Sequence, residues 1–191
     1  MKVESLLKIG TVAALLACVL APTQARAIGL GPYVSGGGGQ LKADYGNANY
    51  KFGGIGLALD TAVAEDTLFN YRLQLGYARA SYDYSDGNRF EMRHIFGFGV
   101  LRTEQVRLWL GPQIGLDYED FGGGSYVGAN IGPALGVNVQ FGPVVSLAVT
   151  VFGGYGVYTN TSRNNDTSED HGQEWQAGVN LALLFRFGEG K

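Results

Sequence analysis

The chain has 191 residues, of which 46% are hydrophobic and only 16% are charged, below the roughly 25% charged share of a typical soluble domain. Its formal net charge of −3 provides no basic surface for nucleic acid, and its single cysteine excludes a disulfide framework within the chain. Glycine contributes 31 residues without a collagen-like repeat, so the glycines require a structural reason of another kind.

The N-terminus is typical of a secretory signal peptide. Lys2 and Lys8 supply a basic start, residues 9–20 form an apolar run, and Ala25-Arg26-Ala27 is an A-x-A cleavage site. We expect residues 1–27 to be removed, which leaves residues 28–191 as one membrane domain without cysteine and therefore without thiol chemistry.

An alternative processing route is a lipoprotein signal. Leu15-Leu16-Ala17-Cys18 resembles a lipobox in which Cys18 would carry the lipid. Apolar residues continue past Cys18 and the A-x-A site follows it, so we favour cleavage after Ala27. A membrane anchor is disfavoured because the apolar run is too short to span a bilayer as a helix.

Eight segments then alternate between apolar residues and polar or very small residues, which is the pattern of strands with two different faces. In chain order these predicted strands span residues 28–41, 50–63, 68–81, 89–103, 106–119, 125–140, 143–158 and 173–187. The first contains the run Gly36-Gly37-Gly38-Gly39, which is weak as an isolated strand and must be held by its neighbours.

The fifth segment shows the alternation most clearly. Its apolar face consists of Val106, Leu108, Leu110, Pro112, Ile114, Leu116 and Tyr118, and its other face of Arg107, Trp109, Gly111, Gln113, Gly115, Asp117 and Glu119. Apart from the tryptophan, this second face is polar, charged or tiny. A tilted strand of this length can cross a bilayer.

The expected connectors alternate in length. Tight turns are predicted near Glu65-Asp66, Glu104-Gln105 and Gly142, and longer polar connectors over residues 44–48, 83–88, 120–124 and 159–172. This asymmetry is typical of outer-membrane barrels, which have short periplasmic turns and longer external loops. It places both termini on the periplasmic side.

Alternation alone does not tell which face is outside, because a soluble lipocalin-like barrel has an apolar interior. The second face is mostly Gly, Ala, Asn and Gln, which suits a narrow lumen better than a water-facing surface. Aromatic residues near strand ends are typical of two interfacial girdles: Phe69, Tyr71, Tyr77, Phe90, Tyr118, Tyr155, Trp175, Phe185 and Phe187. The predicted fold is all-β, an eight-stranded antiparallel up-and-down transmembrane β-barrel.

The closing strand adds a resemblance to known proteins. Residues 178–183, followed by Phe185 and Phe187, resemble the C-terminal assembly signal of outer-membrane proteins, although the chain ends on Gly188-Glu189-Gly190-Lys191 and not on an aromatic residue. With the strand count and face pattern, the chain resembles the small barrels of the OmpA, OmpX and OmpW type. The resemblance implies a Gram-negative outer membrane. The implied partners are lipid, lipopolysaccharide, the assembly machinery and an unidentified external ligand at the loops.

The charged residues on the second face are expected to pair inside the lumen, because an unpaired charge in so narrow an interior is costly. They are Asp60, Arg72, Glu91, Arg93, Arg107, Asp117, Glu119, Glu174 and Arg186. We favour a network that fills and stiffens the lumen. A gated ion path through the same residues is the alternative.

The two histidines do not form a recognisable site. His94 is on the lipid face by parity, and it is followed by Ile95 and Phe96, so the His and Ser two residues apart of lipid A deacylases are absent. His171 lies near Asp166 and Asp170 without the spacing of a calcium loop. We expect a packing histidine and a solvated loop, with no catalytic residue, metal or cofactor.

Gly-Pro pairs occur at 31–32, 111–112, 132–133 and 142–143. Because proline removes a ladder donor, Pro32, Pro112 and Pro133 are expected to mark bulges or kinks next to a flexible glycine. The sequence as a whole favours a non-enzymatic structural or surface-interaction protein. A narrow channel or transporter for small or hydrophobic solutes is the alternative, and a lipid-modifying enzyme is less favoured.

Overall fold

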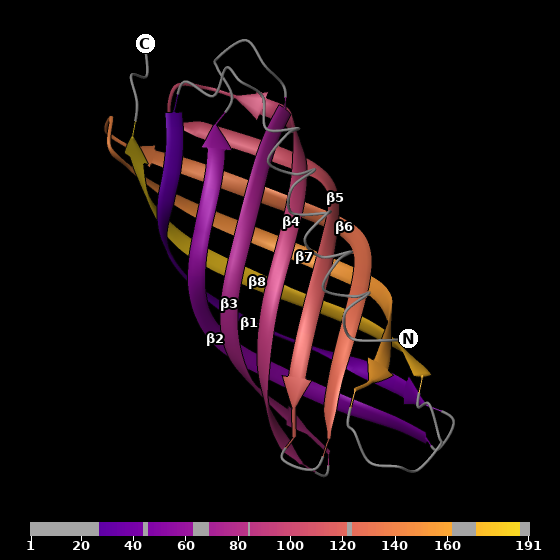
Figure 1. Cartoon of the computed structure of the whole chain (residues 1–191). Coiled ribbons are helices and arrows are strands. Elements are labelled where there is room, and N and C mark those ends of the chain that lie inside the picture. Colours follow the sequence, from indigo (N-terminus) through magenta and orange to yellow (C-terminus); the bar gives the residue numbers. More distant parts are fainter. Residues whose placement is uncertain are drawn as a thin grey trace.

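The structure, a computed structural model, describes residues 27–43, 46–62, 69–83, 85–121, 124–161 and 171–187. Its strands in chain order are β1 (Ala27–Ala43), β2 (Gly46–Ala62), β3 (Phe69–Tyr82), β4 (Asp86–Arg102), β5 (Val106–Asp120), β6 (Ser125–Phe141), β7 (Val145–Asn160) and β8 (His171–Phe187). Each strand pairs antiparallel with the next, and β8 pairs with β1 to close the barrel (Figure 1). The fold predicted from the sequence is therefore confirmed.

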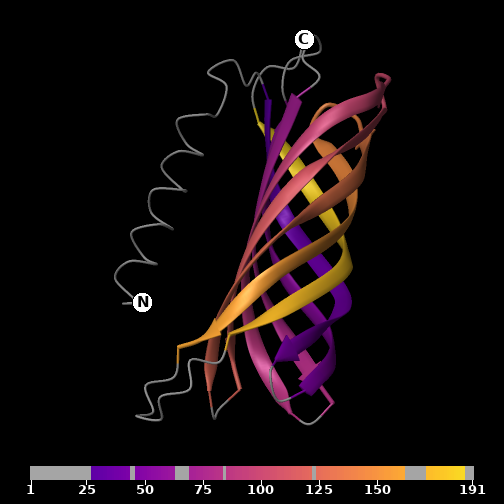
Figure 2. The ribbon, with the colours of Figure 1, turned by 90° about the vertical axis from the view of Figure 1, so that its right-hand side faces the viewer.

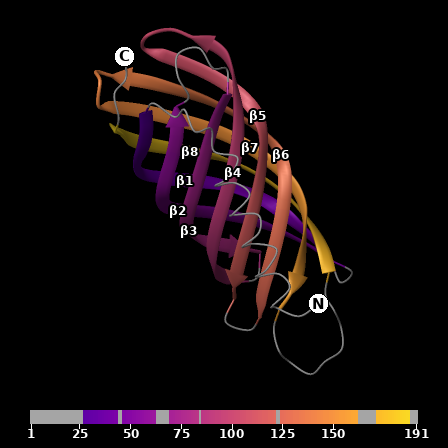
Figure 3. The same cartoon turned by 45° about the horizontal axis from the view of Figure 1, so that its top comes forward.

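The strands are strongly inclined to the barrel axis, and the wall is a single layer around one interior (Figure 2). β1 begins beside the end of β8, with Ile28 opposite Phe187; Figure 3 shows these two strands side by side. We call this the termini end. The opposite end, where β7 leads into β8, is the loop end. No helix among the described residues is long and apolar enough to cross a membrane.

The strands extend further toward the loop end than the sequence predicted. Two residues separate β1 from β2, three separate β3 from β4, and four separate β5 from β6. The longer connectors expected at 44–48 and 83–88 are therefore wrong in length, whereas the one expected at 120–124 differs by a single residue. The apolar alternation stops before the backbone pairing does, because polar residues can continue a hydrogen-bonded ladder. In the register, Gln40 still pairs with Asn49 and Lys42 with Asn47.

The connector between β7 and β8 remains the longest, spanning residues 161–170. Most of it, residues 162–170, lies outside the described residues, as do the expected turn at 65–66 and the signal peptide. The turn between β4 and β5 is tight, as expected. The turn between β6 and β7 is also tight, and Gly142 adopts a φ of +76° there, a conformation that glycine adopts at little cost.

The outer wall is apolar over much of its surface. Exposed side chains on it include Val34, Ile55, Leu57, Phe98, Leu110, Ile131, Leu135, Val151, Val179 and Leu181. A soluble monomer rarely exposes a contiguous apolar surface of this kind, whereas a lipid-facing wall requires one. The facing predicted from the sequence agrees with this arrangement, because the members of the apolar alternation point outward.

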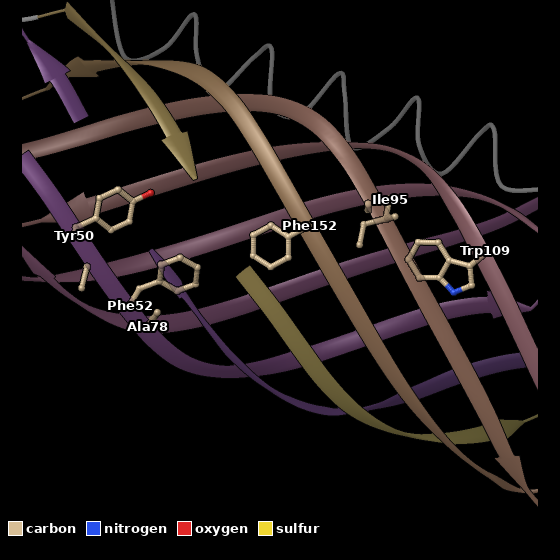
Figure 4. Packing of buried hydrophobic residues seen from close by; sticks show 8 residues of the cluster. Tyr50, Phe52, Ala78, Ile95, Trp109 and Phe152 are labelled. Atoms are coloured by element: carbon tan, nitrogen blue, oxygen red, sulfur yellow. The ribbon is translucent and has the colours of Figure 1, made fainter. Parts of the chain in front are cut away.

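The interior contains large aromatic side chains that the sequence analysis did not place there, apart from Trp109. Tyr50, Phe52, Ile95, Trp109 and Phe152 are buried and spread along the barrel interior in Figure 4. Glycines on neighbouring strands make room for them, as described below for individual rings. The glycine content of the chain therefore serves the packing of a narrow lumen.

Three of the Gly-Pro pairs share one geometry, in which a proline interrupts the ladder on one side of its strand. The β1–β8 register stops between Leu30 and Tyr33, around Pro32. A Cβ on Gly31 would lie 1.8 Å from the carbonyl oxygen of Leu183, so this oxygen already packs against the glycine Cα.

The other two pairs repeat this contact. A Cβ on Gly111 would lie 1.9 Å from the Phe96 oxygen, and one on Gly132 would lie 2.1 Å from the Gly153 oxygen. In each pair proline removes the N–H donor and glycine lets the facing carbonyl approach, in a position suited to a weak Cα–H···O contact. The strand pairs stay closed at these points, and among the described strands the register shifts only between Gly99 and Leu101 of β4.

Candidate functional site

The lumen is the part of the molecule where most charged and polar side chains converge. Three arginines, Arg72 on β3 and Arg89 and Arg93 on β4, are 0–1% exposed. Arg72 and Arg89 pair with carboxylates from other strands, whereas Arg93 pairs with Glu91 of its own strand and stacks on Phe152 of β7. Burying a guanidinium is costly unless its partners are close and well oriented. The three arginines define a termini-end, a central and a loop-end cluster.

In the termini-end cluster, Arg72 forms an ion pair of 2.7 Å with Asp60 on the neighbouring strand β2. It also donates to Thr150 Oγ1 at 2.7 Å and to Asn138 Oδ1 at 2.9 Å, from strands on the other side of the barrel. Its guanidinium carbon lies 5.2 Å from the centre of the Trp109 ring. These contacts tie four strands together across the lumen in addition to β3.

In the central cluster, Glu91 accepts a hydrogen bond of 2.9 Å from the Tyr33 hydroxyl and lies 3.4 Å from Arg93. The Arg93 guanidinium carbon stacks 3.6 Å from the centre of the Phe152 ring. Amide pairs fill the remaining space at this depth, with Asn180 donating to Gln74 at 2.7 Å. The middle of the lumen is therefore occupied by side chains.

The loop-end cluster is the largest and the most acidic. Arg89 lies 2.9 Å from both Asp117 and Glu119 and 3.3 Å from Glu174. The hydroxyl of Tyr50 donates to Glu174, and that of Tyr82 donates to Glu119. Three carboxylates face one arginine, so the cluster has a formal charge of −2 when all of its members are ionised.

Sequence reasoning missed Arg89, the centre of this cluster. The predicted strand began at residue 89, and the inward set was named only from Glu91 onward. The signal was present, since Arg89 shares the parity of Glu91 and Arg93. The inward tyrosines Tyr33 and Tyr50 were missed for a different reason, because aromatic residues were expected on the outer face.

Two predicted members of the lumen network lie nearer the termini end. Arg186 is partly exposed and its Nε donates to Ser146 Oγ at 3.2 Å. Arg107 is half-buried on the inner face of β5, opposite Arg102 in the register. The other seven predicted members are all buried and all belong to the three clusters: Asp60, Arg72, Glu91, Arg93, Asp117, Glu119 and Glu174.

The predicted girdle residues are on the outer face by register. Seven of them are exposed: Tyr77, Phe90, Tyr118, Tyr155, Trp175, Phe185 and Phe187. Phe69 is half-buried, and Tyr71 is only 8% exposed. The Tyr71 hydroxyl lies 2.7 Å from Nδ1 of His94, which is also 8% exposed.

His94 therefore packs against a tyrosine on the outer side of β3 and β4. Within the described part of the chain, the His94 ring forms its side-chain hydrogen bond with Tyr71, and not with a serine or a carboxylate. In the same residues, no group of three His, Cys, Asp or Glu side chains could hold a metal ion. The geometry of the clusters suits structural pairing, since nearly every charge is directed at another side chain.

Eight antiparallel strands in a closed ring, with an apolar outside and a polar inside, define the fold of the small outer-membrane β-barrels. Solved structures agree. The chain is similar to the outer membrane protein OprG from Pseudomonas aeruginosa, with a TM-score of 0.52 and 9% identity over 85% of this chain and 95% of that chain.

Two further similar structures are outer-membrane or surface proteins. The AlkL structure in lipid bilayers has a TM-score of 0.47 and 13% identity, over 84% of this chain and 92% of that chain. Neisserial surface protein A has a TM-score of 0.43 and 18% identity, over 80% and 96%. No family model and no curated protein matches the sequence. At 9% identity the likeness to OprG concerns the fold alone, and it agrees with the eight-stranded barrel described above.

Proposed function

We propose that the protein is a non-enzymatic outer-membrane barrel with a closed lumen and a structural or surface-interaction role. The observation that carries this proposal is the filled interior. Arg72, Arg89, Arg93, Tyr33, Gln74 and Gln113 are all 2% exposed or less, and they come from successive depths of the barrel. An open water-filled path would leave such side chains partly accessible.

The membrane location is supported by the fold and by the apolar outer wall. We place the loop end outside the cell and the termini end in the periplasm, because the longest connector follows β7 at the loop end and the long loops of such barrels are external. Because only the connector after β7 is long, the loop end offers one extended loop and the rims of paired strands for contact with other molecules. Lipopolysaccharide would be the immediate neighbour of this rim.

The enzyme alternative receives little support from His94. A lipid-modifying site needs a nucleophile or activated water beside the histidine, and the His94 Nδ1 contacts the Tyr71 hydroxyl instead. We therefore expect His94→Ala to leave the acylation pattern of lipopolysaccharide unchanged in cells that express the protein. A changed pattern that depends on His94 would favour the enzyme.

The proposal is tested by planar-bilayer recording of the refolded protein. We expect no sustained single-channel current from the wild-type barrel. The triple variant Arg72→Ala with Arg89→Ala and Arg93→Ala removes the central side chain of all three clusters and should produce current. The control Val151→Ala truncates an exposed outer residue and should remain closed. Steady current through the wild-type protein would overturn the closed lumen and favour the channel.

A further inference from the structure

The loop end of the barrel contains a cavity of about 320 Å³ that the closed-lumen role does not explain. Its principal lining residues are Leu41, Ala48, Tyr82, Phe121, Tyr126 and Tyr158, and we call it the vestibule. Its volume is at the lower end of the ~300–1,000 Å³ range of small-molecule sites, so it can hold a small organic ligand.

The aromatic rings of the vestibule are packed against one another in a continuous row. Tyr82 and Phe121 have centroids 4.7 Å apart, Phe121 and Tyr126 5.6 Å, and Tyr126 and Tyr158 5.7 Å, all in edge-to-face geometry. Such contacts fix ring orientation. The row therefore exists before any ligand arrives, which lowers the entropic cost of binding.

Glycines hold two of these rings in place. A Cβ on Gly172 would lie 2.2 Å from the ring of Tyr158, and one on Gly87 would lie 2.7 Å from the ring of Phe121. Both rings thus lie directly over the backbone of a neighbouring strand. A ring held in this way has little freedom to rotate out of the vestibule, and its position is a property of the strand pairing.

The vestibule is connected to the acidic loop-end cluster through Tyr82. The ring of Tyr82 lines the cavity while its hydroxyl donates to Glu119, and Tyr50 stacks on Tyr82 at 5.0 Å and donates to Glu174. The excess of carboxylates over Arg89 gives a negative potential, which low-dielectric walls focus toward the open mouth. An anion would be repelled there.

We propose that the vestibule binds a small organic cation, an ammonium group with apolar substituents. Aromatic faces attract such a cation through the ring quadrupole, the carboxylates supply opposite charge, and Leu41 and Ala48 contact the apolar part. Binding of a cation in the vestibule does not depend on whether the lumen conducts ions. A conducting wild-type barrel would overturn the closed lumen and leave the vestibule proposal intact.

The test compares choline with its uncharged carbon isostere, in which a tert-butyl group replaces the trimethylammonium group. Both are titrated into the folded full-length barrel in maltoside micelles, which carry no ammonium group, with chemical shifts of the vestibule residues as the readout. We expect saturable binding of choline, with an affinity about 5- to 30-fold above that of the isostere.

Three variants assign the binding to the vestibule. Tyr126→Leu removes a ring but keeps an apolar side chain, and Glu119→Gln removes one carboxylate, so both should weaken choline more than the isostere. Phe121→Leu replaces Tyr126→Leu if the latter fails to fold. The control Tyr77→Leu changes an exposed tyrosine outside the cavity and should have no effect.

Two outcomes would overturn the proposal. Equal affinities for the two ligands would show a merely apolar pocket, in which charge contributes nothing. Absence of saturable choline binding, or a loss of binding in Tyr77→Leu equal to that in Tyr126→Leu, would show that the vestibule is not a cation site.

Discussion

Aromatic rings inside this barrel occupy space that glycines on neighbouring strands leave open. A Cβ on Gly136 would lie 2.1 Å from the Trp109 ring, and one on Gly76 would lie 2.1 Å from the Tyr33 hydroxyl. Each of these glycines thus leaves open the space that one particular large side chain occupies. Because a β-barrel of eight strands has a narrow interior, large and small residues must alternate across it.

The first prediction concerns this complementarity. Gly136→Ala forces Trp109 away from its position over Arg72 and Asn138, so we expect a loss of about 1–3 kcal/mol in the free energy of unfolding, the usual range for overpacking. Gly53→Ala is the matched control, because the nearest atom to its new Cβ lies 3.9 Å away. Reversible urea unfolding in lipid vesicles measures both. Equal stabilities would contradict the packing role of Gly136.

The second prediction concerns the buried ion pair of Arg72 and Asp60. Asp60→Ala leaves the guanidinium with neutral partners only, the hydrogen-bond acceptors Thr150 and Asn138 and the Trp109 ring, so we expect the free energy of unfolding to fall by about 3–5 kcal/mol. The double variant Asp60→Ala with Arg72→Met removes both charges and should recover a large part of the loss. A double variant as unstable as the single one would mean that the pair contributes by packing and not by charge compensation.

Among the elements, β5 shows how far alternation determines the structure. The expected strand 106–119 is observed as Val106–Asp120, with Leu110 52% exposed outside and Gln113 fully buried inside. Gln113 donates to Asn130 Oδ1 at 3.0 Å and to the Gly153 oxygen at 3.1 Å. Successive side chains of a strand alternate between its two faces, so the sequence pattern shows which residues share a face. Because one face is buried, the pairing register with the neighbouring strands is also fixed.

The third prediction tests the facing of β5. Leu110→Arg places a charge in hydrocarbon and should cost about 2–4 kcal/mol near the bilayer midplane. Leu110→Ala removes the same side chain without adding a charge, so it should cost much less. The measurement is unfolding in lipid vesicles. If the arginine variant were as stable as the alanine variant, Leu110 would not face lipid.

Sequence patterns predicted the number, order and faces of the strands, and seven lumen charges that the structure buries. They did not predict the contents of the interior. Phe52 and Phe152 have the parity of the small and polar residues, and only the space over Gly37 and Gly178 accommodates their rings. Such complementarity between distant strands depends on register and closure, which a single sequence does not display. The vestibule was missed for the same reason, since its lining comes from separate strands and connectors.

At the scale of the whole molecule, closure determines behaviour in detergent. All strand edges in the described barrel are paired, because β1 joins β8. The fourth prediction is that the unheated protein migrates differently from the boiled protein on SDS gels, since a barrel without free edges resists SDS. Circular dichroism of the unheated sample should show β structure. Identical migration together with a helical spectrum would contradict the fold.

The two ends of the barrel interior differ in the sign of their formal charge. The loop end has three carboxylates around Arg89, whereas Arg72, Arg107 and Arg186 lie toward the termini end, where Asp60 pairs with Arg72. In the described residues the interior thus has a negative half and a positive half. This polarity supports a cation, and not an anion, as the ligand at the loop end.

The placement of Pro32 has a consequence for how the ring opens and closes. Strands β1 and β8 are the first and last strands of the meander, so no turn links them. Pro32 leaves the Leu183 carbonyl without its usual N–H donor in the termini-end half of their junction. Pro112 and Pro133 interrupt junctions whose strands are each joined by a tight turn at the termini end. The β1–β8 junction should therefore be the last to form during insertion and the first to separate. Its backbone amides should exchange with deuterated solvent sooner than those between β1 and β2.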